Sequence, residues 1–160
     1  MKDISTTISF YRPPENVFEL IKARDQHKSC KNGHEICVCI ICQEETCYDC
    51  SELSKHFIQK HCNEGISINL LNGRLMYFIN GKITALDSIY CNEIGSNWTP
   101  SKSAEGYFCD KETYEEIKQS ILKNNVYDYL KQKYSHFWNK NWYKKRNDQC
   151  KFIYFWIKTG

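Results

Sequence analysis

The chain has 160 residues, enough for one ordinary domain or for a small metal-binding module attached to a second modest core. The net charge of +3 is small, no stretch contains the roughly 18–20 apolar residues of a membrane span, and the N-terminus lacks the apolar segment of a signal peptide. We therefore expect no membrane partner and a protein that is kept in the cytoplasm or the nucleus.

The cysteine and lysine contents also carry information. Ten Cys in a reducing compartment do not indicate a disulfide framework, so metal binding or burial has to explain them. Eighteen of the 22 basic residues are Lys, and Ile and Asn are abundant, which is typical of an AT-rich genome. This composition suggests a viral protein from a large DNA virus, or a protein of an AT-rich parasite.

Residues 1–26 are predicted to form an N-terminal arm and a short helix. Pro13-Pro14 ends an extended segment, and residues 15–23 place apolar side chains at helical spacing. The composition then changes abruptly, because residues 27–62 hold seven of the ten Cys and four of the five His. We expect a metal-binding module to begin at residue 27.

A three-stranded antiparallel meander is predicted over residues 66–86. Its apolar runs are separated by Asn72-Gly73 and by Asn80-Gly81, and Asn-Gly tolerates the positive φ angles of a type I′ turn. Residues 27–86 would thus form one zinc finger with its meander.

The remainder of the chain is predicted to be a loop followed by helices. Residues 87–109 are polar and interrupted by Gly and Pro, which favours a loop. Residues 110–160 are predicted to be a helical, basic and aromatic segment in which Asp110 caps a helix to about residue 124, a second helix covers 126–138, and 151–157 form a buried strand. The expected fold class is α+β.

The Cys and His residues of the module have the spacing of zinc ligands. Two Cys-x2-Cys pairs precede two His at helical spacing, and zinc takes four sulfur or nitrogen ligands in a tetrahedron. Residues 51–60 would form the helix that presents the His residues. The first predicted zinc site consists of Cys39, Cys42, His56 and His61.

A second zinc site is predicted around Cys47 and Cys50, which need two ligands from upstream. Cys30 is the preferred third ligand, while His34 and His27 compete to be the fourth, so both one zinc and two zincs stay open. The competing interpretation is that these cysteines are buried small apolar residues. Packing is the role assigned to the five remaining cysteines, Cys37, Cys62, Cys91, Cys109 and Cys150.

The segment 30–86 resembles the zinc finger of ubiquitin-specific proteases, the UBP finger. The resemblance rests on Cys30, Gly33-His34, Cys39-x2-Cys42, Cys47, His56, His61 and the hairpin that begins at Asn72-Gly73-Arg74-Leu75. It implies a zinc-bound interaction module with ubiquitin as a candidate partner, and at most two zincs, since Gly33 stands where the family has a Cys. The ligand spacing over residues 39–56 is also similar to that of a B-box, another cross-braced interaction module.

No catalytic residues are expected. His136 stands among aromatic residues and has no catalytic partner nearby in the sequence, and the cluster offers more ligands than a catalytic zinc uses. We therefore expect a non-enzymatic interaction or adaptor protein that acts on host ubiquitin or transcription machinery.

The alternative function is nucleic-acid binding through the C-terminal segment. Residues 127–160 contain eight Lys or Arg against two Asp, and within residues 134–146 the basic side chains alternate with aromatic ones. Such a surface can stack nucleobases and neutralise phosphates. The candidate residues for phosphate contacts are Lys140, Lys144, Lys145 and Arg146.

Overall fold

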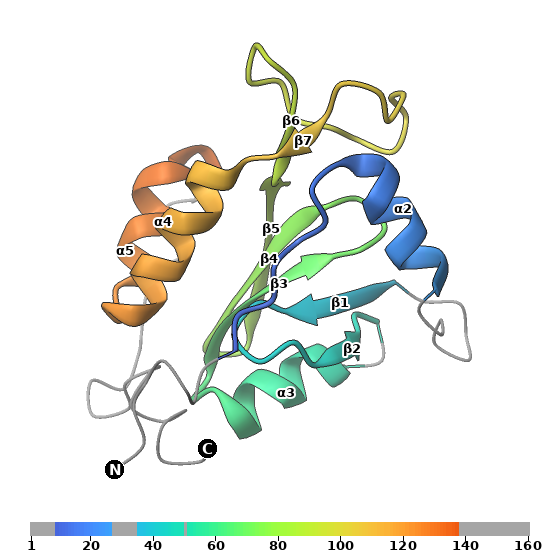
Figure 1. Ribbon diagram of the computed structural model, residues 1–160. Helices are drawn as coiled ribbons and strands as arrows, with labels where there is room; N and C mark the ends of the chain where they lie inside the picture. The colour runs from blue at the N-terminus through green and yellow to red at the C-terminus, as the bar shows by residue number, and fades with distance from the viewer. Residues whose placement is uncertain (1–8, 27–34, 50, 138–160) are drawn as a thin grey trace.

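A five-stranded antiparallel sheet forms the centre of the protein (Figure 1). The structure, a computed structural model, describes residues 9–26, 35–49 and 51–137. The strands lie in the order β2-β1-β3-β4-β5. Their bounds are β1 Ile36–Cys39, β2 Glu45–Cys47, β3 Glu64–Asn69, β4 Arg74–Ile79 and β5 Lys82–Ser88. The expected α+β class is confirmed.

The predicted meander corresponds to β3, β4 and β5, which pair in sequence order. At the second turn, Asn80 and Gly81 have φ angles of 48° and 84°, as a type I′ turn requires, and Ile79 lies opposite Lys82. The sheet is larger than predicted because β1 pairs with β3 and extends it toward β2.

Helices cover the sheet on more than one side. All six residues of β3 are buried, as are five of the six in β4, so both faces of these strands are shielded from water. Figure 1 shows α2 and the α4–α5 pair on opposite sides of the sheet, with α3 next to β2. The helices are α2 Val17–Gln26, α3 Glu52–Lys60, α4 Lys111–Leu122 and α5 Val126–Lys133, and a 3-10 helix η1 covers Ser135–Phe137.

The predicted helices are present with shifted ends. Asp110 caps α4 as expected, since its side chain accepts a hydrogen bond of 3.1 Å from the Thr113 backbone N–H. The second C-terminal helix ends earlier than predicted and continues as η1. Among the described residues, no helix is long and apolar enough to span a membrane.

The segment 87–109 is more ordered than the predicted loop. Its strands β6 Tyr90–Cys91 and β7 Phe108–Cys109 pair antiparallel, and Tyr90 and Trp98 are buried in the core. The Tyr90 hydroxyl donates a hydrogen bond of 2.7 Å to the Pro14 carbonyl, which ties this segment to the N-terminal arm. Two buried aromatic side chains thus order a segment for which the polar composition predicted a loop.

Candidate metal centre

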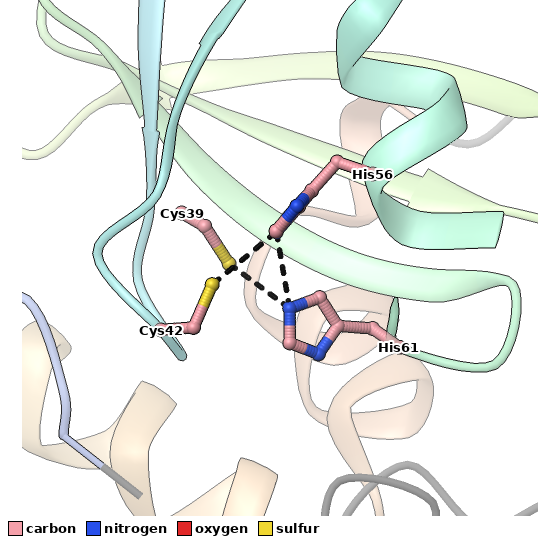
Figure 2. A group of neighbouring side chains, drawn as sticks. All are labelled: Cys39, Cys42, His56 and His61. Carbon is pink, nitrogen blue, oxygen red and sulfur yellow. Dashed lines mark hydrogen bonds between the residues drawn. The ribbon is translucent and has the colours of Figure 1, made fainter. Parts of the chain in front are cut away.

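Four predicted ligands come together where β1, the turn after it and α3 meet (Figure 2). Cys39 is the last residue of β1, and Cys42 lies in the turn that leads to β2. His56 lies within α3, and His61 is the residue at which that helix ends. The pattern predicted for the first zinc site is therefore brought together in space.

Helix α3 directs its histidine inward because it is amphipathic. Leu53, His56 and Phe57 are its buried residues, at the i, i+3 and i+4 spacing of a single helix face. After the helix ends, the Asn63 backbone N–H donates a hydrogen bond of 3.0 Å to the Phe57 carbonyl. This tight turn keeps His61 close to His56, with their ring centroids 4.7 Å apart.

The distances between the ligand atoms fit one metal ion. Cys39 Sγ lies 3.6 Å from His61 Nε2, Cys42 Sγ lies 3.3 Å from His56 Nε2, and the two Nε2 atoms are 3.1 Å apart. All four donor atoms lie within 4.8 Å of one another. Tetrahedral zinc with its usual bond lengths separates its ligand atoms by roughly 3.3–3.8 Å. The cluster can hold a metal ion with little movement.

Burial and mutual contacts set the protonation of these groups. Burial raises the pKa of Cys39 well above its ordinary value, whereas the hydrogen bond from Cys39, with further ones from the two histidines, lowers the pKa of Cys42. Burial lowers the pKa of His61, which keeps that imidazole neutral. Cys42 is thus a ready thiolate and His61 a ready neutral ligand, and Cys39 would lose its proton to the metal.

Glu44 supports the cluster from outside and was not singled out from the sequence. Its Oε2 atom lies 2.8 Å from His56 Nδ1 and 3.4 Å from Lys60 Nζ. Because His56 turns Nε2 toward the cluster, the carboxylate lies at the nitrogen that a metal would leave unused. In metal sites, a carboxylate that accepts a hydrogen bond from this nitrogen fixes the tautomer and orientation of the imidazole. Glu44 is within ion-pair distance for this role, although the two atoms are not aligned as a hydrogen bond in this structure. An acidic residue two positions after Cys42, in a turn facing the helix, is a weak signal of this role.

Replacing Glu44 by Gln is expected to weaken metal binding by about 10- to 100-fold while leaving the fold intact. The change removes the negative charge next to His56 but preserves side-chain size. Competition with a chromophoric chelator measures the affinity, and the neighbouring Glu45→Gln variant, which has the same change of charge, is the control. Equal affinities in both variants would show that Glu44 does not orient His56.

The second predicted site is only partly within the described residues. Cys47 is buried in β2, while Cys30, His34, its competitor His27, and Cys50 lie outside them. No second cluster of metal-binding side chains occurs within residues 9–26, 35–49 and 51–137. The second zinc site stays a prediction. The nucleic-acid candidates Lys140, Lys144, Lys145 and Arg146 also lie outside the described part.

The cysteines assigned to packing have different environments. Burial raises the pKa of Cys37, and that of Cys109, to about 12, as expected for thiols held in a core. Cys91 lies on β6 and is half-buried. Cys62 is buried and disulfide-bonded, where the sequence predicted packing alone.

Comparison of the chain with protein-family models, curated proteins and solved structures found no match.

The local architecture of the cluster is a β-hairpin followed by a helix. Cys39 and Cys42 lie at the hairpin turn, and His56 and His61 follow after 13 and then four intervening residues. This spacing is that of zinc sites of the Cys2His2 type. Strand β1 of this hairpin also belongs to the large sheet through its pairing with β3.

Proposed function

We propose that this protein is a non-enzymatic, zinc-stabilised interaction protein. The observation that carries the proposal is the convergence of Cys39, Cys42, His56 and His61 within 4.8 Å. Two cysteine sulfurs and two imidazole nitrogens suit zinc better than the hard cations, which prefer oxygen ligands.

A structural role for the zinc follows from the number and burial of its ligands. Four protein side chains fill a tetrahedral site, whereas a catalytic zinc keeps one position for water or substrate. Cys39 and His61 are both 0 % exposed and His56 is buried, while Cys42 is half-buried, so most of the site is shielded from solvent. With all four positions on the metal taken by side chains, function would reside on the surface around it.

The surface of α3 suits a protein partner better than a nucleic acid. Ile58 is 49 % exposed on this helix, whose exposed charged residues are Glu52, Lys55 and Lys60. The turn between β1 and β2 adds Glu44, whose Oε2 atom lies 3.4 Å from Lys60 Nζ. Phosphate-binding surfaces are strongly positive, whereas protein interfaces combine an exposed apolar residue with a mixed-charge rim.

Ubiquitin is the first partner to test, because the resemblance of residues 30–86 to a UBP finger implies it. We expect the zinc-loaded full chain to bind ubiquitin with little change in affinity between low and moderate salt. An Ile58→Asp variant should weaken this binding by about tenfold or more, as charge in the centre of an apolar contact does. Leu122→Asp, at an exposed leucine of α4, is the matched control.

The competing function predicts a different result when binding is measured with nucleic acid in place of ubiquitin. Binding to mixed-sequence oligonucleotides that falls steeply with salt, and that is lost on reversing the charges of Lys144, Lys145 and Arg146, would support a nucleic-acid-binding protein. Absence of ubiquitin binding together with this result would overturn the proposed function.

A further inference from the structure

The two edges of the sheet differ in how much of their backbone is already used. At one edge, β2 has only three residues, and α3 packs against it. The Cys47 backbone N–H donates a hydrogen bond of 2.9 Å to Glu52 Oε2 of that helix. A short strand whose outward donor is capped by a side chain is a closed edge.

The other edge, β5, is longer, and side chains of the described residues cap only its second half. It has seven residues and pairs only with β4 in the described part of the sheet. Arg74 donates hydrogen bonds of 2.9 Å and 2.7 Å to the Ala85 and Leu86 carbonyls, and Asn97 donates one of 2.8 Å to the Ser88 carbonyl. The open part of this edge lies around Ile83.

Lys82 and Ile79 flank the two-residue turn and therefore form a hydrogen-bonded pair. Because the backbone groups of successive residues in a strand point alternately toward and away from the partner strand, the N–H and C=O of Ile83 point away from β4. Ile83 and Ala85 are half-buried residues packed against the core. Such an edge is a template for another strand.

The chain leaves the described region next to this edge. His136 Nε2, in η1, lies 3.4 Å from Asp87 Oδ2 of β5. Residues 138–150 then separate η1 from the segment 151–157. Thirteen extended residues reach up to about 45 Å, whereas the seven residues of β5 span only about 23 Å. The connecting segment is therefore long enough to bring residues 151–157 to any part of β5.

The sequence of residues 151–157 is suited to a sheet. It reads Lys-Phe-Ile-Tyr-Phe-Trp-Ile, in which six consecutive residues are aromatic or β-branched and uncharged. These residue types are enriched in strands, and a run of this kind left in water would be an aggregation site. The segment has seven residues, as β5 does.

We propose that the outer edge of β5 is a docking site for residues 151–157 of the same chain, which would add a sixth strand to the sheet. The pairing would bury the apolar segment and satisfy the outward backbone groups of Ile83, while the Ala85 and Leu86 carbonyls keep their hydrogen bonds from Arg74. Residues 138–150, with Lys140 and Arg146, would then form a loop that is held at both ends.

Amide hydrogen exchange of the full chain tests this proposal. The Ile83 amide should be protected in the wild-type protein and should exchange at least tenfold faster in Tyr154→Pro, because proline removes a donor and breaks strand pairing. Asn147→Pro, in the connecting segment, is the control and should exchange like wild type. Unchanged exchange of β3 amides in all three proteins verifies that the fold is retained.

Two results would overturn the proposal. An Ile83 amide that exchanges freely in the wild-type chain, or one that Tyr154→Pro does not affect, would show that the segment does not pair with β5. Protection that grows with protein concentration would show instead that a second copy of the chain occupies this edge.

Discussion

Removing the metal at neutral pH is expected to unfold the whole five-stranded sheet, not only the region of α3. Cys39 terminates β1, and β1 pairs with β2 on one side and with β3 on the other. Structural zinc contributes about 10–16 kcal/mol to the folding of zinc-finger peptides, as much as the total stability of a typical domain. Near-ultraviolet circular dichroism, followed during titration with a strong chelator, should therefore lose its signal in one transition.

Elemental analysis of variants identifies the ligands behind this effect. Cys39→Ser should lose the zinc of the described cluster and unfold, while Cys91→Ser, at a half-buried cysteine on β6, should retain both zinc and fold. Cys47→Ser distinguishes one zinc from two, because it lowers the zinc content by one only if the predicted second site exists. A sheet that keeps its tertiary signal after complete chelation would contradict the structural role of the metal.

Substitution of Gly65 by Ala is expected to destabilise the protein by about 3 kcal/mol, near the upper end for overpacked cores. A Cβ atom at this position would lie 2.0 Å from Phe57 Cδ1 and 2.1 Å from Phe57 Cε1. The Phe57 ring is fully buried and stacks on Phe78 with ring centroids 5.6 Å apart, so it has little space to move away. Urea denaturation of the zinc-loaded protein measures the change.

The same substitution should also weaken zinc binding. The Phe57 ring lies 5.2 Å from the ring of His56 and 5.8 Å from that of His61, between centroids, so its displacement would disturb both imidazoles. Gly81→Asn is the control, because nothing lies within 4 Å of that Cβ position and Asn tolerates its positive φ angle. A Gly65→Ala protein with the midpoint and zinc affinity of the control would show that the ring can rotate aside.

The features that could be predicted from the sequence are those with a local signal. The Asn80-Gly81 turn located β4 and β5, Asp110 marked the start of α4, and the spacing of Cys39 and Cys42 identified the knuckle of the cluster. Each depends on a few neighbouring residues whose conformation or ligand chemistry is strongly restricted.

The features that the sequence did not reveal depend on contacts between distant residues. The run from Ile36 to Cys39 was interpreted for its ligands alone, although its pairing with β3 makes it part of the sheet. Residues 87–109 are ordered because Tyr90 and Trp98 are buried in the common core, and Tyr90 also hydrogen-bonds the distant Pro14 carbonyl. The contact of Glu44 with His56 likewise depends on how α3 packs against the turn between β1 and β2.

The double membership of β1, in the hairpin of the metal centre and in the main sheet, has a consequence for the lifetime of the protein in a cell. Above the dissociation constant, each tenfold change in free zinc changes the folding free energy by about 1.4 kcal/mol. A chain without zinc would present an entirely unfolded substrate to proteases, not a folded body with one loose finger. The amount of this protein should therefore follow the free zinc concentration, so that metal scarcity shortens its half-life before any partner is encountered.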